Sequence, residues 1–253
     1  MSTLFSLKGK VALITGASKG IGEAIAHLYA HQGAKVVVNS RKQEAVDAVA
    51  QAINEAGGEA IGVAGQIGSE EDLQHVFDQT IAQYGKLDIL VNNAATNPVF
   101  GPVEETDERA FDKIMAVNVK APFTLAKQAL PIMEKNGGGS IINMSSIGGV
   151  SPEPMLGIYS VSKAALISLT KVLAKEWGQR GIRVNVICPG LIKTKFSEAL
   201  WRNEKLTQQL LQQLPINRIG VPEDIAGLSL FLASDASAYC TGSVYNADGG
   251  FLI

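Results

Sequence analysis

Cysteine and histidine are scarce in this sequence. Its 253 residues include only two cysteines, Cys188 and Cys240, too few for the disulfide framework of a small secreted protein. Neither stands in a Cys/His pattern that would indicate a nucleophile. The three histidines, His27, His31 and His75, have no carboxylate or cysteine partners at ligand spacing. We therefore expect two reduced, structural cysteines and no metal site.

Excess charge and long apolar runs are also missing. Lysine and arginine total 22 against 24 aspartate and glutamate, a formal net charge of −2. This balance excludes a general attraction to nucleic acid or anionic membranes. No stretch shows the roughly 18 apolar residues of a membrane span, and the N-terminal region has no signal-peptide pattern. We expect a cytoplasmic protein with neither a nucleic-acid nor a membrane partner.

What the sequence does contain is a large apolar fraction, 46%, arranged in alternating short and long segments. Strands are predicted at 11–15, 35–40, 60–64, 87–91, 140–144, 183–187 and 243–246, and helices at 20–32, 43–56, 70–84, 107–119, 121–135, 159–179 and 223–233. Such alternation predicts right-handed βαβ crossovers around a buried parallel sheet. The fold class is α/β: a single Rossmann-like, doubly wound domain over 1–253, with about seven strands and helices on both faces.

Residues 191–217 interrupt the alternation. This insertion follows a strand's carboxyl end, where ligands bind in doubly wound sheets. It is interpreted either as a substrate lid or as an ordinary amphipathic helix packed on the body, and the two interpretations are compatible.

A glycine-rich turn follows the first strand. In Thr15–Gly22 the glycines allow close approach to a pyrophosphate, and the following helix offers free N–H groups. The spacing G-x3-G-x-G meets the general dinucleotide fingerprint only in part. Its position on the first βα turn favours a cofactor site over a purely structural turn. The predicted contacts are Gly16, Ser18, Lys19, Gly20, Ile21 and Gly22.

The second strand ends without an acidic residue. Asn39, Ser40, Arg41 and Lys42 stand where an NAD-specific protein usually carries Asp or Glu. Ser40, Arg41 and Lys19 could instead hold a 2′-phosphate. The alternative is that Arg41 and Lys42 are solvated charges, but cations at a helix start oppose the helix dipole. The sequence therefore predicts NADP(H) rather than NAD(H).

Tyr159 and Lys163 are four residues apart, on one face of a predicted helix. A free tyrosine, with a pKa of about 10, is a weak base at neutral pH, and a neighbouring cation lowers that pKa. Ser145 and Ser146 follow a strand at the same predicted edge. Asn118, in an otherwise apolar helix, needs hydrogen-bond partners.

Together these motifs resemble the short-chain dehydrogenase/reductase family from about Lys8 to Gly250. The matching motifs are Thr15–Gly22, Asn92 to Ala95 (with Ala95 replacing the usual glycine), Asn118, Ser146, Tyr159 with Lys163, and Pro189 to Thr194.

The resemblance implies the roles of four catalytic residues. Tyr159 exchanges a proton with the substrate oxygen, and Ser146 orients that oxygen. Lys163 lowers the tyrosine pKa and holds the nicotinamide ribose, while Asn118 anchors a water. It also implies the remaining cofactor contacts: Asn92, Ala94, Tyr159, Lys163, Pro189, Gly190, Ile192 and Thr194, with Gln66 and Ile67 at the adenine, where relatives carry Asp-Val.

Finer features are similar to the NADP-dependent carbonyl/retinal reductase subgroup. These are Arg41-Lys42, Asn97-Pro98, the segment 151–154, and Leu191 to Thr194 with Leu200-Trp201. The expected substrate is a small apolar carbonyl compound or its alcohol. The alternatives are a 3-oxoacyl-acyl-carrier-protein reductase, a sugar or steroid alcohol dehydrogenase, or a non-catalytic NADP-binding regulator. The family resemblance implies a homotetramer, and we expect the apolar residues 251–253 to be buried at a subunit contact.

Overall fold

Seven parallel strands form one continuous sheet at the centre of the computed structural model, which describes residues 3–202 and 204–253. They are β1 (Val11–Ile14), β2 (Lys35–Ser40), β3 (Glu59–Ala64), β4 (Ile89–Asn92), β5 (Gly139–Met144), β6 (Ile182–Pro189) and β7 (Val244–Ala247). Their spatial order is β3-β2-β1-β4-β5-β6-β7. The predicted doubly wound fold is confirmed, and the strand order reverses between β1 and β4.

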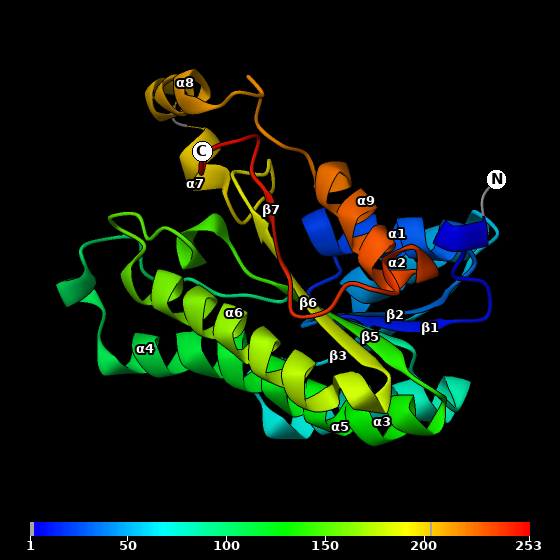
Figure 1. Cartoon of the computed structure of the whole chain (residues 1–253). Coiled ribbons are helices and arrows are strands. Elements are labelled where there is room, and N and C mark those ends of the chain that lie inside the picture. Colours follow the sequence, from blue (N-terminus) through cyan, green and yellow to red (C-terminus); the bar gives the residue numbers. More distant parts are fainter. Residues whose placement is uncertain (1–2, 203) are drawn as a thin grey trace.

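Helices cover both faces of this sheet (Figure 1). On one face lie α1 (Gly20–His31), α2 (Gln43–Glu55) and α9 (Pro222–Ala233), and on the other α3 (Glu70–Tyr84), α5 (Ala121–Lys135) and α6 (Gly157–Trp177). Each face has its own apolar core. Central strands are therefore buried on both sides, which explains why Val36, Val37 and Val38 run consecutively without polar alternation.

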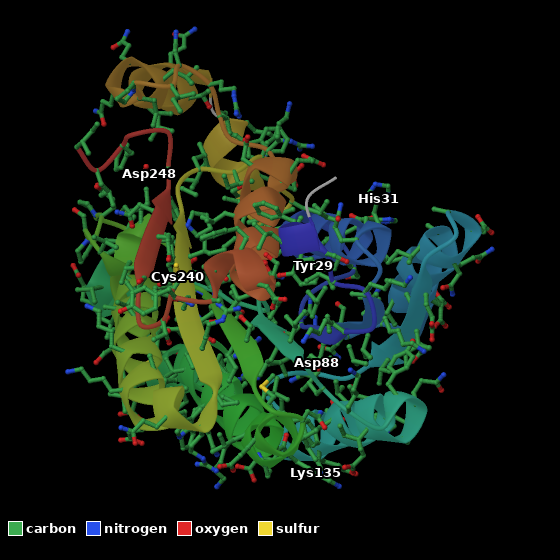
Figure 2. The ribbon with its side chains drawn as sticks, turned by 45° about the vertical axis from the view of Figure 1, so that its right-hand side comes forward. Tyr29, His31, Asp88, Lys135, Cys240 and Asp248 are labelled. Atoms are coloured by element: carbon green, nitrogen blue, oxygen red, sulfur yellow. The ribbon has the colours of Figure 1, made fainter. Side chains whose placement is uncertain are left out.

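The contact between α1 and α9 contains a buried polar pair. The Tyr29 hydroxyl donates to the Ser229 carbonyl at 2.9 Å, and the two hydroxyl oxygens are 2.6 Å apart. Burial raises the pKa of the Tyr29 phenol well above its usual range. Tyr29 is labelled beside α9 in Figure 2.

The parallel register gives the sheet two chemically different edges. At the amino edge, the Asp88 carboxylate accepts from the Val11 N–H at 2.8 Å and pairs with Lys86 at 2.9 Å. At the carboxyl edge, Asp248 follows β7, and its oxygens accept from the Gly250 and Leu252 N–H groups. Figure 2 labels both aspartates. The loops expected to carry the chemistry all leave from the carboxyl edge.

Two sequence expectations need correction. The predicted helices at 107–119 and 121–135 are one continuous helical run: α4 (Glu108–Met115), a π-helical turn (Ala116–Lys120) and α5.

The second correction concerns the stretch Gly157–Arg180, which is long and apolar enough to cross a membrane by length and composition alone. It packs against the sheet through α6, whose contacts with β5 and β6 place Leu166 and Leu173 in buried positions.

The insertion at residues 191–217 contains two short helices, α7 (Glu198–Trp201) and α8 (Glu204–Gln213). Its two ends pair with each other where they leave the body. The Lys193 N–H donates to the Gly220 carbonyl at 2.8 Å, and the Gly220 N–H donates to the Leu191 carbonyl at 3.1 Å. The insertion therefore rises from a hydrogen-bonded base beside β6 and β7.

Candidate active site

The glycine turn after β1 is built for close backbone approach. Gly16 and Gly20 have φ of +64° and +63°, a region that side chains disfavour. A Cβ at Gly16 would lie 2.8 Å from the Ala94 Cα, and one at Gly22 would lie 2.6 Å from the Gly16 carbonyl oxygen. Each of these three positions therefore requires glycine.

Asn93 and Thr15 fix this turn to the end of β4. The Asn93 amide donates to the Thr15 and Gly16 carbonyls at 2.9 and 3.1 Å. The Thr15 hydroxyl oxygen accepts from the N–H groups of Asn93 and Ala94 at 3.0 and 3.1 Å. Asn92 was the predicted cofactor contact, whereas its neighbour Asn93 in the motif Asn92 to Ala95 is the residue whose side chain holds the glycine turn.

The Asn92 side chain does not hold the glycine turn but makes a hydrogen bond inside the molecule. It is buried and donates to the Asn143 Oδ1 at 2.8 Å, and the Asn143 amide in turn donates to Thr170 at 2.9 Å. This chain of amides and hydroxyl joins β4 and β5 to α6 inside the molecule. A cofactor contact by Asn92 would have to come from its main chain.

The N-terminus of α1 is open. Lys19, the residue before the helix, is extended and its side chain makes no capping hydrogen bond, so the first N–H groups are free for an anion. The Ser18 hydroxyl donates to the Ser40 hydroxyl at 3.0 Å, joining the turn to the end of β2. Arg41 follows with an exposed guanidinium that has no hydrogen bond or ion pair within the described residues. Ile21 packs against the apolar core.

The two predicted adenine contacts at the end of β3, Gln66 and Ile67, lie in different surroundings. The Gln66 side chain is exposed, and the main-chain N–H of Gln66 donates to the Asp72 carboxylate at 2.8 Å. The Ile67 side chain is buried in the core, so only its main chain could line a ligand. Asn39 shapes this corner, because its amide donates to the Val63 and Gly65 carbonyls.

The segment after β6 closes over the glycine turn from the other side. The Gly190 N–H donates to the Ala247 carbonyl at 3.0 Å, and Pro189 ends β6. The buried Ile192 pairs with Gly220. A Cβ at Gly20 would lie 3.2 Å from the Thr194 methyl group. Thr194 and the glycine turn thus form two sides of one cradle.

Ser146, rather than Ser145, lies next to the Tyr159 phenol. The Ser145 hydroxyl is buried and donates to the Lys163 carbonyl at 2.8 Å. Ser146 begins a short 3-10 turn and is half-buried. The nearby Ser146 hydroxyl lowers the pKa of the Tyr159 phenol. The structure therefore brings together the serine and tyrosine that the sequence analysis paired.

Lys163 carries a charge inside the protein. Its side chain is 1% exposed, and Nζ donates to the Met144 carbonyl at the end of β5, at 2.8 Å. Nζ lies 5.6 Å from the centre of the Tyr159 ring. Burial lowers the pKa of Lys163 to about 8. Lys163 is positioned to act on the tyrosine electrostatically.

The Tyr159 pKa differs from the sequence expectation. Burial of the ring raises the pKa of the phenol to about 12, and the nearby Ser146 hydroxyl offsets only part of that increase. Desolvation of the buried phenol therefore outweighs the lowering that the sequence predicted from Lys163. Tyr159 is therefore a protonated acid at neutral pH.

Asn118 lies in the π-helical turn and is fully buried. Its amide oxygen accepts from the Thr96 N–H at 2.9 Å, and its amide nitrogen donates to the Thr96 carbonyl and the Ser162 hydroxyl, each at 3.0 Å. Ser162 donates to the Tyr159 carbonyl at 2.6 Å. In this structure Asn118 therefore positions the loop after β4 against the helix of the tyrosine, and the predicted water site stays a prediction.

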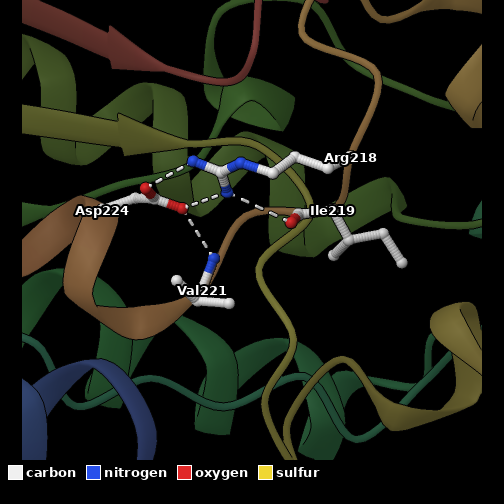
Figure 3. A network of polar contacts seen from close by, with 4 residues as sticks. All are labelled: Arg218, Ile219, Val221 and Asp224. Carbon is white, nitrogen blue, oxygen red and sulfur yellow. Dashed lines mark hydrogen bonds and ion pairs between the residues drawn. The ribbon is translucent and has the colours of Figure 1, made fainter.

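The insertion reaches the same site through Phe196, whose ring centre lies 6.1 Å from that of Tyr159. Its base is fastened to α9 by Arg218. The guanidinium binds both oxygens of Asp224, at 2.6 and 2.7 Å, and Asp224 also accepts from the Val221 N–H at 2.8 Å (Figure 3). Arg218 lowers the pKa of the Asp224 carboxyl to about 2.

Together, the glycine cradle and the Ser146–Tyr159–Lys163 cluster define a nucleotide-binding α/β oxidoreductase. The family described as Enoyl-(Acyl carrier protein) reductase matches residues 16–252. Dehydrogenase/reductase SDR family member 4 of Sus scrofa is 46% identical over 244 residues, covering 96% of this chain and 88% of its own length. This chain belongs to the short-chain dehydrogenase/reductase family.

Two solved structures show how closely the fold is shared. A 7α-hydroxysteroid dehydrogenase complexed with NADH and 7-oxo glycochenodeoxycholic acid is 38% identical, with a TM-score of 0.95 over 99% of this chain and 97% of that chain. A gluconate 5-dehydrogenase from Burkholderia cenocepacia J2315 in complex with NADP and tartrate is 31% identical, with a TM-score of 0.93 over 98% and 97%. Relatives with different substrates and cofactors thus share this framework.

The buried charge of Lys163 makes a stability prediction. At pH 7 both the folded and the unfolded chain hold the proton, so the folded state bears the full cost of burying the charge. Between about pH 8 and pH 10 the unfolded chain holds more protons at this lysine than the folded chain does, so the contribution of Lys163 to stability rises with pH. Relative to Lys163→Met, the free energy of unfolding should therefore increase across this range, by up to about 3 kcal/mol.

Urea unfolding at pH 7, 8, 9 and 9.5 measures this difference. Lys171→Met, at an exposed position of the same helix, is the matched control and should show no such trend. A difference between wild type and Lys163→Met that stays constant from pH 7 to pH 9.5 would contradict the buried-charge account.

Proposed function

We propose that this protein is an NADP(H)-dependent reductase of apolar ketones and aldehydes. The observation that carries the proposal is the Ser146–Tyr159–Lys163 cluster, which lies at the carboxyl edge of the sheet with the Phe196 ring beside it. The reaction adds a hydride to the carbonyl carbon and a proton to the carbonyl oxygen, giving an alcohol.

NADP(H) is supported by the chain's own charges. The gluconate 5-dehydrogenase structure is in complex with NADP and the hydroxysteroid dehydrogenase structure with NADH. The choice between the two cofactors in this chain must therefore be argued from its own residues at the end of β2. Ser40 ends β2 and Arg41 follows it, with no hydrogen bond or ion pair to its guanidinium among the described residues, and Lys19 is exposed on the adjoining glycine turn. A guanidinium, an ammonium and hydroxyls suit a phosphate. Bound in the cradle, the cofactor would supply the hydride from its nicotinamide.

The protein's own residues would manage the proton. Because the pKa of Tyr159 is about 12, the phenol holds its proton at neutral pH and can donate it to the carbonyl oxygen. The Ser146 hydroxyl would hydrogen-bond the same oxygen and orient it. The Lys163 ammonium, 5.6 Å from the ring, would stabilise the phenolate that remains.

The insertion would act as a lid over an apolar substrate. Phe196 supplies an aromatic wall next to Tyr159, and Met155, just before α6, is also exposed. Trp201 braces the insertion instead, since its indole N–H donates to the Thr194 carbonyl at 2.8 Å and Lys193 lies over its ring. These side chains favour a carbonyl with apolar substituents over a sugar.

The alternative functions find less support. An acyl-carrier protein is acidic and needs free cations, but the Arg180 guanidinium is already paired with Glu134, to which it donates at 2.9 Å. A non-catalytic regulator would have no need of the assembled Ser146, Tyr159 and Lys163.

We further propose a homotetramer. Exposed apolar side chains gather on the outer helices, namely Phe111 on α4, Phe123 on α5, and Val161 and Val172 on α6, and Ile253 is fully exposed. Leaving such surfaces in water is unfavourable. Light scattering at micromolar concentration is expected to give four times the chain mass, and a monomer would contradict this proposal.

The function itself is tested by cofactor depletion. Wild type should oxidise NADPH with aryl ketones, diketones or retinal, and more slowly or not at all with acetoacetyl thioesters. Tyr159→Phe, which keeps the ring, removes the proton donor and should reduce kcat by at least about 100-fold. Retention of most activity by Tyr159→Phe would refute the proton-transfer role.

Arg41→Ala tests the cofactor preference. Loss of a charge-assisted phosphate contact should raise KM for NADPH about 10-fold or more and leave KM for NADH nearly unchanged. Lys42→Ala, an exposed neighbour, is the matched control. Equal rates with NADH and NADPH in the wild type would contradict the assignment.

A further inference from the structure

The strand β3 forms one edge of the seven-stranded sheet, so one side of its backbone has no neighbouring strand. An unpaired edge is a template on which another strand can pair, and charged residues or proline on the edge commonly discourage such pairing. Residues 60–64 of β3, Ala-Ile-Gly-Val-Ala, contain neither a charge nor a proline. This part of β3 therefore lacks the usual protection of an exposed edge.

Two side-chain amides of α2 occupy the backbone groups along this edge. The Asn54 amide nitrogen donates to the Ala60 carbonyl at 2.9 Å, and the Asn54 Oδ1 accepts from the Ala60 N–H at 2.7 Å. The Gln43 amide nitrogen donates to the Gly62 carbonyl at 3.0 Å, and the Gln43 Oε1 accepts from the Ala64 N–H at 3.1 Å. Each amide offers donors and an acceptor, as the backbone of a neighbouring strand would.

The placement of the two amides on α2 matches the strand. Gln43 and Asn54 stand about three turns of helix apart, so they lie on the same side of α2. Gly62 lets the helix come close, because a Cβ there would lie 2.6 Å from the Asp47 Oδ1. The same oxygen accepts from the Gln43 amide nitrogen at 2.7 Å and holds that side chain over the edge.

A second copy of this chain is the partner that the unmasked edge would fit. Identical edges can pair antiparallel about a two-fold axis, and with the axis at Gly62 each Ala60 faces the Ala64 of the other copy. The side chains at these three positions are small and uncharged, so no like charges oppose the contact. Glu59, the charged residue of β3, is already paired with Lys35 of its own chain at 3.1 Å.

We propose that Gln43 and Asn54 form a self-masking contact, which keeps the edge of β3 from pairing with the same edge of a second copy of this chain. The self-masking contact is independent of the proposed reduction, since neither residue belongs to the Ser146–Tyr159–Lys163 cluster. It is also separate from the proposed tetramer, whose apolar surfaces lie on α4, α5 and α6. Pairing through β3 would join whole assemblies to one another.

Hydrogen exchange of individual amides tests the self-masking contact in dilute protein. In Asn54→Leu the Ala60 N–H loses its acceptor and should exchange at least about 10-fold faster, while the Ala64 N–H keeps its rate. In Gln43→Leu the Ala64 N–H should exchange faster and the Ala60 N–H should not. Unchanged rates would overturn the proposal. So would equal acceleration of both amides in each variant, because it would mean that α2 had only come loose from the strand.

Light scattering over a range of protein concentrations tests the docking of a second copy. The mass of Gln43→Leu/Asn54→Leu should rise with concentration to about twice that of the wild type or more. The Ala60 and Ala64 amides should regain their protection as the mass rises, because they then pair with the strand of the other copy.

Gln51→Leu is the matched control, since Gln51 is exposed on the same helix and donates to Glu55 at 2.7 Å rather than to β3. It should keep the wild-type mass and the wild-type exchange rates, which separates edge pairing from the effect of an added leucine. A double variant that keeps the wild-type mass at every concentration would overturn the proposal. Association that leaves the Ala60 and Ala64 amides exchanging rapidly would also overturn it, because another surface would then make the contact.

Discussion

The site depends on one buried interaction, the hydrogen bond from the Lys163 ammonium to the Met144 carbonyl. An ammonium in the interior is costly unless its donors are satisfied and its charge is useful. Here it ties α6 to the last residue of β5. The Ser145 hydroxyl makes a second tie to the same lysine's carbonyl. With these two contacts in place, Tyr159 on α6 and Ser146 after β5 cannot move apart.

The second constraint is topological. Because every neighbouring pair of strands is parallel, the loops after six strands meet at one edge. The reversal of strand order between β1 and β4 leaves room there for a ligand. Asn93 fastens the glycine turn on one side, and Thr194 approaches Gly20 from the other. The sheet thus prepares a cradle, and α6 brings the proton donor to it.

Much of this arrangement could be predicted from the sequence, because glycine spacing, buried valine runs and the tyrosine–lysine spacing are local signals. What failed depends on tertiary contacts. Which of Asn92 and Asn93 faces the turn depends on strand register. The inward direction of Ile67 and the π turn around Asn118 depend on packing. The Phe196–Tyr159 contact and the Arg180–Glu134 pair each join residues far apart in the chain. Neither contact could therefore be predicted from local sequence patterns.

The electrostatic state of the site suits the proposed reduction. A phenol whose pKa is raised to about 12 would give up its proton only when a basic oxygen forms next to it, and the nearby Lys163 charge would then stabilise the anion that is left. On this proposal the buried lysine serves the reaction rather than the folded state, since burial has lowered its own pKa to about 8.

If this edge of the sheet directs hydride and proton to one carbonyl group, the hydride can be followed by its isotope. An aryl ketone is reduced with NADPH that carries deuterium at both hydrogens of the nicotinamide C4, and the product is analysed by NMR. We expect one deuterium on the carbinol carbon, with the hydroxyl proton drawn from solvent. Cofactor oxidation that leaves the carbinol carbon free of deuterium, or no oxidation with any carbonyl, would contradict it.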